Sequence, residues 1–227
     1  MINILGISIH LYGILIGLGV WIGLEIALVS RPKLTKELEE SFVWALLTGV
    51  VGARLYHVVD YWNRYYSANF WKIFAVWEGG LGIWGAIVGA ILGLGVYSKL
   101  KNKNIFPLMD AFVIGAPIAQ AVGRIGNWVN GELVGRNGQP LFAYEAGLNI
   151  LLFIFLVYID RLPHPPGRVR NDGRLIGVYL IGYGVIRILL EGIRPDNIIW
   201  RIGGIPTAII FGAISGLIGL YLVLKEF

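Results

Sequence analysis

The sequence predicts an all-α integral membrane protein with about seven transmembrane helices. Hydrophobic residues make up 56% of the 227 residues, and the mean hydropathy is +0.70. Only 15% of the residues are charged, whereas soluble domains carry about 25%. The apolar runs are long and continuous rather than alternating, which favours helices over a β-barrel. No low-complexity linker or internal repeat divides the chain, so residues 1–227 are expected to form a single transmembrane domain.

Seven apolar segments follow one another along the chain, and each is close to the length of a helix that crosses a bilayer. They are Ile7–Val29, Phe42–Trp62, Leu81–Tyr97, Ile105–Arg124, Leu141–Ile159, Leu175–Ile193 and Ile205–Leu224. The fourth segment is the weakest candidate, because it contains Asp110, Pro117, Gln120 and Arg124. The N-terminus lacks the basic start and the cleavage site of a signal peptide, so the first segment is expected to be retained.

Lysines and arginines are distributed unevenly between the two sides of these segments. Eleven lie in the connections and the end on one side, five lie on the other side, and Arg54, Arg124 and Arg187 lie within the segments. The positive-inside rule therefore predicts an external N-terminus and a cytoplasmic C-terminus. The same rule accounts for most of the net charge of +5, so the charge gives no reason to expect a nucleic-acid partner.

Cysteine is absent from the chain, and the three histidines are far apart in the sequence. The protein therefore has no disulfide, no thiolate metal site and no cysteine nucleophile of its own. We expect neither a metal ion nor a cofactor.

The predicted orientation places the polar residues of the apolar segments near one surface of the membrane. Residues from six segments and their external connections reach the outer leaflet. These residues are His10, Tyr12, Arg54, His57, Glu78, Trp84, Arg124, Asn127, Asn130, Glu132, Tyr144, Glu145, Arg187 and Glu191. Because charged groups at membrane depth are costly, their gathering at a single depth predicts a polar cavity that opens toward the outer leaflet.

The stretch from Gly123 to Gly135 is the most polar part of this set. Arg124 and Arg187 suit an anionic phospholipid head group, since guanidinium donors match phosphate oxygens and stay charged in a poor dielectric. Asn127 and Asn130 add neutral donors and acceptors. The glycines at 123, 126, 131 and 135 allow sharp turns and a close approach of the backbone to a ligand. These residues favour a membrane enzyme or a lipid-binding protein that acts on phospholipid.

A purely structural interpretation exists for several of these residues. Tyr183, Arg187 and Glu191 are spaced at i, i+4 and i+8, so they share one helix face and can form an internal ion pair. Arg124 can snorkel from the end of its segment to the interface. His57 is more typical of a packed histidine than of a catalyst.

The segment Gly123–Gly135 resembles the signature of the prolipoprotein diacylglyceryl transferase family, G-R-x-G-N-[aromatic]-x-N-x-E-x-x-G. It departs only at Trp128, where phenylalanine is commoner in the family. The similarity runs from about residue 8 to the last segment. Further matching motifs are His10-Leu11-Tyr12-Gly13, Gly52-Ala53-Arg54, Trp77-Glu78-Gly79-Gly80-Leu81, Tyr144-Glu145, and Tyr183-Gly184 with Arg187 and Glu191.

This resemblance implies seven spans, an external N-terminus and a location in the bacterial cytoplasmic membrane. It also implies transfer of the diacylglyceryl group of phosphatidylglycerol to the lipobox cysteine of a preprolipoprotein, with release of glycerol phosphate. The expected catalytic residues are Arg124, Arg187 and Glu191. The residues expected to bind substrate are Arg124, Asn127, Asn130, Glu132, Gly135, Tyr12, Tyr183 and Arg54.

The chain differs from many members of this family at two positions. Trp84 stands where many members have a histidine that is proposed as the base, and Gln139 replaces a histidine ahead of the Tyr-Glu pair. The external region between the fourth and fifth segments is also short, from Arg136 to Pro140. The group that accepts the thiol proton is therefore open among Glu132, Glu191 and His10, with the field of the arginines as a substitute.

Two other functions compete with the transferase. A lipid transporter or flippase predicts polar groups near the bilayer midplane and inverted repeats, and neither is found in the sequence. An inactive relative that binds lipid or partner proteins is the second alternative.

Overall fold

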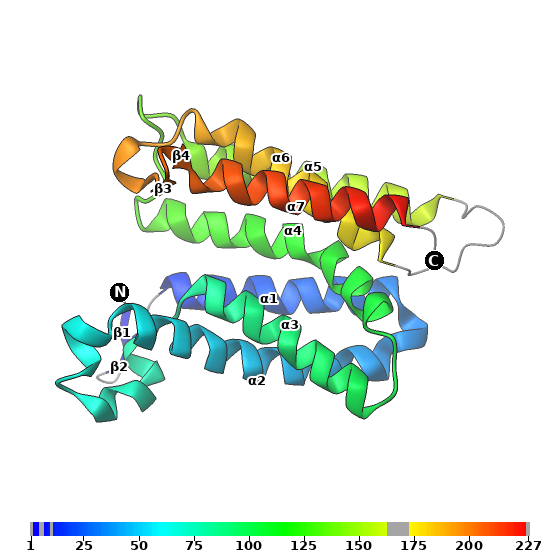
Figure 1. Cartoon of the computed structure of the whole chain (residues 1–227), viewed down its shortest axis with the longest axis horizontal. Coiled ribbons are helices and arrows are strands. Elements are labelled where there is room, and N and C mark those ends of the chain that lie inside the picture. Colours follow the sequence, from blue (N-terminus) through cyan, green and yellow to red (C-terminus); the bar gives the residue numbers. More distant parts are fainter. Residues whose placement is uncertain (1, 5–6, 10, 163–172, 226–227) are drawn as a thin grey trace. The chain divides into compact units, whose positions relative to one another are not determined.

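The computed structural model describes residues 2–4, 7–9, 11–162 and 173–225, and helices dominate it (Figure 1). The long helices are α1 (Leu11–Ser30), α2 (Thr35–Asp60), α3 (Ile83–Leu100), α4 (Ile105–Val129), α5 (Leu141–Arg161), α6 (Arg174–Glu191) and α7 (Thr207–Leu224). All except α6 are long and apolar enough to cross a membrane. Helix α6 has 18 residues and carries Arg174, Arg187 and Glu191. The predicted class, an all-α multi-pass membrane protein, is confirmed, whereas the number of spans and the orientation stay predictions.

Short elements connect the long helices. The strands are β1 (Ile2–Ile4), β2 (Ile7–Ile9), β3 (Arg201–Ile202) and β4 (Ile205–Pro206), and they pair as two antiparallel two-stranded sheets. The short helical turns are η1 (Pro32–Leu34), η2 (Trp62–Tyr66), η3 (Phe70–Phe74), η4 (Val76–Glu78) and η5 (Asp196–Ile198).

The first apolar segment was predicted to begin at Ile7, and this start is wrong for the helix. Residues 7–9 form strand β2, which pairs with β1 in the register Ile2↔Ile9 and Ile4↔Ile7. Both strands alternate isoleucine with a small polar residue, the pattern of a strand, and β-branched side chains favour this conformation. The first helix therefore begins at Leu11.

The chain forms two compact units. The first contains Met1–Pro32 and Met109–Phe227, and the second contains Lys33–Leu108. Helices α1, α5, α6 and α7 and most of α4 belong to the first unit, and helices α2 and α3 belong to the second.

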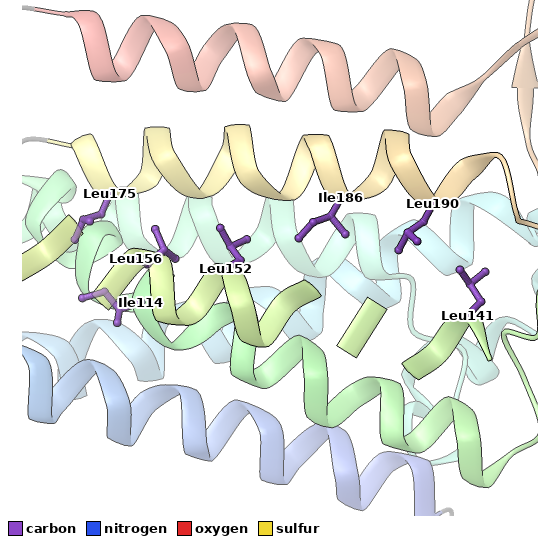
Figure 2. Close-up of a cluster of buried hydrophobic side chains, with 7 residues drawn as sticks. All are labelled: Ile114, Leu141, Leu152, Leu156, Leu175, Ile186 and Leu190. Carbon is purple, nitrogen blue, oxygen red and sulfur yellow. The ribbon is translucent and has the colours of Figure 1, made fainter. Parts of the chain in front are cut away.

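The apolar core of the first unit lies mainly between α5 and α6. Figure 2 shows leucines of α5 and aliphatic side chains of α6 along the facing sides of these helices, with Ile114 of α4 nearby. The members of this cluster are Ile114, Leu141, Leu152, Leu156, Leu175, Ile186 and Leu190. On α5 the buried residues recur every three or four positions, so one face of the helix is turned to the interior.

Small residues allow close approach between the helices of the first unit. A side chain at Gly115 of α4 would collide with the backbone of Gly23 in α1, and one at Gly184 of α6 would collide with Gly212 in α7. In lipid, helices associate by such close packing rather than by a hydrophobic driving force. These glycines therefore set the distance between α1 and α4 and between α6 and α7.

Two polar contacts join the helices of the first unit at the end opposite Arg124. Arg31, just after α1, donates to both carboxylate oxygens of Asp160 on α5, at 2.5 and 2.8 Å. Asp110 of α4 is 1% exposed and accepts hydrogen bonds of 3.0 Å from the backbone N–H groups of Gly173 and Ile176. Asp110 thus satisfies two of the otherwise unpaired N–H groups at the start of α6.

Candidate functional site

A buried carboxylate forms the centre of the polar cluster in the first unit. Glu145, in the first turns of α5, is 2% exposed. One carboxylate oxygen lies 2.5 Å from Nε of Arg124 on α4, in an ion pair without the alignment of a hydrogen bond. The other oxygen lies 3.2 Å from Nη1 of Arg187 on α6 and 3.5 Å from Nη2 of Arg194. Helices α4 and α6 and the turn after α6 therefore bring three guanidinium groups to one side chain of α5.

A second carboxylate completes this arginine cluster, which we define as Arg124, Glu145, Arg187, Glu191 and Arg194. Glu191 ends α6, is 5% exposed, and faces Nε of Arg194 at 3.8 Å. Burial lowers the pKa of Arg194 from its ordinary value, and the neighbouring charge of Arg187 acts in the same direction. Three positive groups against two negative ones leave the cluster with one net positive charge.

The asparagines of the signature connect this cluster to Glu132. Nη1 of Arg124 donates to Oδ1 of Asn127 at 2.9 Å, and Nδ2 of Asn127 donates to Glu132 at 3.1 Å. Asn130 donates to the other oxygen of Glu132 at 3.3 Å. Glu132 is exposed, and its carboxylate accepts hydrogen bonds from these two amides.

The end of the fourth helix differs from the sequence-based prediction. Asn127 was expected in an external connection, but α4 continues to Val129, so Asn127 lies in the helix three residues after Arg124. This spacing places both side chains on one face and allows their hydrogen bond. The backbone then turns at Gly131, with φ of 69°, and at Leu133, with φ of 60°.

Two glycines of the signature are sites of close packing. A side chain at Gly126 would collide with the ring of Tyr12 on α1, which places Tyr12 beside the C-terminal part of α4. The N–H of Gly135 donates to the carbonyl of Gln139 at 2.7 Å, and a side chain there would meet Gln139 and the carbonyl of Ile193. Gly135 thus lets the connection after α4 lie against the end of α6.

Tyr183 lies about one turn before Arg187 on α6, and Tyr179 lies about two turns before it. The rings of Tyr183 and Tyr179 stack with centroids 5.9 Å apart, and the hydroxyl of Tyr179 accepts a hydrogen bond of 2.9 Å from Gln120 on α4. Polar groups therefore extend from the arginine cluster into the interior of the unit.

Arg54 belongs to the second unit and is 6% exposed. Its guanidinium donates to five backbone carbonyls in the connection between α2 and α3, at 2.5 to 3.0 Å, and it also lies over the ring of Tyr66. The carbonyls belong to Lys72, Ile73, Ala75, Gly79 and Gly80.

The other two polar positions of the second unit are His57 and Trp84. His57 contacts the hydroxyl of Tyr66 at 3.0 Å and stacks on Tyr61, which fits a packed histidine. Trp84 lies in the first turn of α3 and is 47% exposed. His10, a candidate base, lies outside the described residues.

Sequence reasoning gave no role to two members of the cluster. Glu145 was placed at the correct end of its helix but was not selected as a site residue, and Arg194 was assigned to an external connection. Arg194 comes only three residues after Glu191, and this closeness was a usable signal, although α6 ends at Glu191 and Arg194 lies in the turn that follows. The pairing of Glu145 with Arg124 depends on the rotation of two helices, which the apolar pattern does not reveal.

The arrangement is suited to binding an anion. In the described part of the chain, no three His, Asp or Glu side chains gather as they would to hold a metal ion. The three guanidinium groups retain N–H donors beyond those paired with Glu145 and Asn127. A partly buried cluster with net positive charge can stabilise a phosphate and the charge that develops on it.

Comparison with known proteins places this geometry in a family. The sequence model described as prolipoprotein diacylglyceryl transferase matches residues 1–225. Curated relatives named phosphatidylglycerol–prolipoprotein diacylglyceryl transferase include those of Finegoldia magna (35% identical, covering 86% of this chain and 83% of the relative) and Listeria innocua (32%; 88% and 79%). Another is that of Clostridioides difficile (31%; 99% and 95%). The chain belongs to the prolipoprotein diacylglyceryl transferase family.

Proposed function

We propose that this membrane protein transfers the diacylglyceryl group of phosphatidylglycerol to the lipobox cysteine of a preprolipoprotein. The location would be the bacterial cytoplasmic membrane, with the site open to the outer leaflet. The observation that carries the proposal is the arginine cluster on Glu145, which lies beside the Gly123–Gly135 signature and has one net positive charge. A phosphodiester carries one negative charge and matches this excess.

The reaction forms one bond and breaks another. The cysteine sulfur attacks the glyceryl carbon that bears the phosphate, the carbon–oxygen bond breaks, and glycerol phosphate leaves. The thiol proton passes to a base. The departing phosphate gains a second negative charge, so guanidinium groups that bind it lower the barrier more than they tighten ground-state binding.

Arg124 and Arg187 would hold the phosphate, and Glu191 would position the arginines through Arg194. Asn127 would orient Arg124, since it accepts a hydrogen bond from that guanidinium. Tyr12 and Tyr183 would line the lipid pocket beside these groups. Gly135 would keep the backbone close to it.

Glu132 is more accessible to an incoming thiol than Glu191, which favours Glu132 as the group that takes the thiol proton. Glu132 is exposed and is held by the amides of Asn127 and Asn130. Glu191 is buried and faces Arg194. An incoming peptide can reach the first carboxylate without displacing a guanidinium. A free thiol has a pKa of about 8.5, so removal of its proton assists attack near neutral pH.

The test is an assay in vesicles that contain phosphatidylglycerol and a lipobox peptide, with the thioether product measured by mass spectrometry. Arg124→Ala and Arg187→Ala should each lower the rate by about 100-fold or more, because each removes a donor to the developing charge. Arg201→Ala is the matched control, since Arg201 is an exposed external arginine outside the cluster. Glu132→Gln should lower the rate most near neutral pH.

Each outcome separates the alternatives. Undiminished product in both arginine variants would remove their proposed roles. A wild-type protein that binds phosphatidylglycerol but forms no thioether would favour the inactive lipid-binding relative. Lipid movement between leaflets without thioether would favour the transporter.

A further inference from the structure

Asn149 of α5 is a buried polar residue that the reaction described above does not use. It is 1% exposed. Neither Oδ1 nor Nδ2 has a hydrogen-bond partner among the residues that the structure describes. It lies on the buried face of the helix, between Glu145, which contacts the arginines, and Leu152, which packs against Gly182 of α6. Asn149 therefore faces the same interior as the arginine cluster.

An amide in this position is unfavourable for folding alone. A buried amide without a partner destabilises the folded state, and in lipid no bulk water compensates it. The residue fits a site in which the partner is supplied by something that binds. Gln120 of α4 shows that this interior holds other polar groups, since its Nε2 donates to Tyr179 while its Oε1 is buried without a hydrogen-bond partner in the described part of the chain.

These residues form a second polar layer next to the arginine cluster. Asn149 follows Glu145 by four residues, which places it about 6 Å further along α5. Gln120 precedes Arg124 by four residues, and Tyr183 precedes Arg187 by four. Since α5 runs antiparallel to α4 and α6, all three steps lead in the same direction, away from the signature end of the unit.

The order of the two layers matches the order of chemical groups in a diacyl phospholipid. The phosphate is the anionic group, and the two ester groups follow on the neighbouring carbons of the glycerol, toward the acyl chains. A lipid whose phosphate binds the arginines would present its ester carbonyls to the next layer. Amide N–H groups donate well to such carbonyl oxygens, which accept and never donate.

We propose that Asn149 recognises an ester carbonyl of the diacylglyceryl group and so selects diester over diether lipids. This inference rests on the proposed function. It adds a specificity residue to the site and assigns the buried amide to the part of the donor that is transferred.

The experiment is a competition between two donors in one assay. Dioleoyl phosphatidylglycerol and its diether analogue are mixed in equal amounts with the lipobox peptide, and the two thioether products are separated by mass. The wild-type protein should prefer the diester by about tenfold, the size expected for one or two hydrogen bonds. Asn149→Leu has the same branched shape without donors, and it should reduce the preference to about twofold or less.

The ratio of the two thioether products decides whether Asn149 recognises the ester. A wild-type protein without preference would overturn the proposal, and so would an Asn149→Leu variant that retains the preference or loses both products equally. If the wild-type protein forms product from neither donor, the result would instead contradict the proposed transfer reaction. If Asn149→Leu does not accumulate in the membrane, Asn149→Ala allows the same comparison.

Thermal stability separates a binding role from a structural one. If the amide serves a ligand, Asn149→Leu should unfold in detergent at the same or a higher temperature than the wild-type protein. A structural amide would give a lower temperature.

Ser98→Ala is the matched control, because Ser98 in α3 is also buried with an unpartnered oxygen in the described chain but belongs to the other unit. Its donor preference should stay at the wild-type value.

Discussion

At the scale of single residues, Arg124 and Arg187 differ from Arg54 in the partners that they contact. Arg124 and Arg187 contact a carboxylate and keep further donors. Arg54 donates instead to five backbone carbonyls and is almost fully buried. Its geometry favours a role in holding the connection between α2 and α3 over the lipid-binding role expected from the sequence.

Arg54→Lys tests this difference. Lysine has three donors on one nitrogen and cannot reach carbonyls that a planar fork reaches together, so buried carbonyls would lose their partners. We expect a loss of about 2–4 kcal/mol in stability, seen as a lower unfolding temperature in detergent. The KM for phosphatidylglycerol should stay unchanged. A raised KM at unchanged stability would restore the lipid-binding interpretation, and Arg64→Lys, at an exposed position of the same unit, is the control.

At the scale of elements, glycine determines how closely the helices pack. Gly115 of α4 lies against the backbone of Gly23 in α1, while Gly17 of α1 has open space where a side chain would stand. Helix α4 also carries Arg124 and Asn127, so its distance from α1 bears on the site as well as on the fold.

Gly115→Ala and Gly17→Ala form a matched pair for this contact. The first should destabilise the protein by about 1–3 kcal/mol, because the added methyl group forces the two backbones apart. The second should be neutral or should stabilise it by up to about 1 kcal/mol, through the better helix propensity of alanine. Unfolding in detergent measures both. Equal effects of the two changes would show that the α1–α4 contact is not limiting.

The sequence predicted the helices better than it predicted their ends. Runs of apolar residues are typical of helices in lipid, so seven segments could be drawn, and each overlaps one long helix. The apolar pattern does not show whether polar residues at the end of a segment are still helical. The prediction therefore ended the fourth segment at Arg124, whereas α4 continues to Val129. The pattern also missed the start of α2 at Thr35, because the first turns of that helix carry Lys36, Glu37 and Glu40.

The site was predicted in part for a related reason. Arg124 and Arg187 were singled out because charge is rare in apolar segments. Glu145 was found at the right level but received no role, since one acidic residue near a helix start has many explanations. Asn149 was missed because a lone asparagine in an apolar run gives little signal, and only its burial without a partner distinguishes it.

At the scale of the whole molecule, the orientation in the membrane is the main prediction left to test. The chain has no cysteine, so single cysteines can be introduced without a background. Asn137→Cys, between α4 and α5, should react with a membrane-impermeant maleimide in protoplasts or spheroplasts whose cytoplasmic membrane is intact. Lys33→Cys, between α1 and α2, should react only after permeabilisation, as the positive-inside rule requires.

The reverse pattern of labelling would invert the orientation and place the arginine cluster at the cytoplasmic face. The proposed site could then not receive a lipobox cysteine from outside. Both positions are exposed, so a failure of both to react after permeabilisation would contradict the described surface.

The hydrogen bonds from Gly173 and Ile176 to Asp110 have a consequence for the alignment of the two arginine-bearing helices. Ile176 is about 17 Å along α6 from Arg187, and Asp110 is about 21 Å along α4 from Arg124. A slip of one residue at this joint would turn α6 by about 100° and swing Arg187 away from its partner. The rotation of Arg187 about the axis of α6 is thus set by contacts at the opposite end of that helix, and a chimera that exchanges α6 alone must keep these contacts in register.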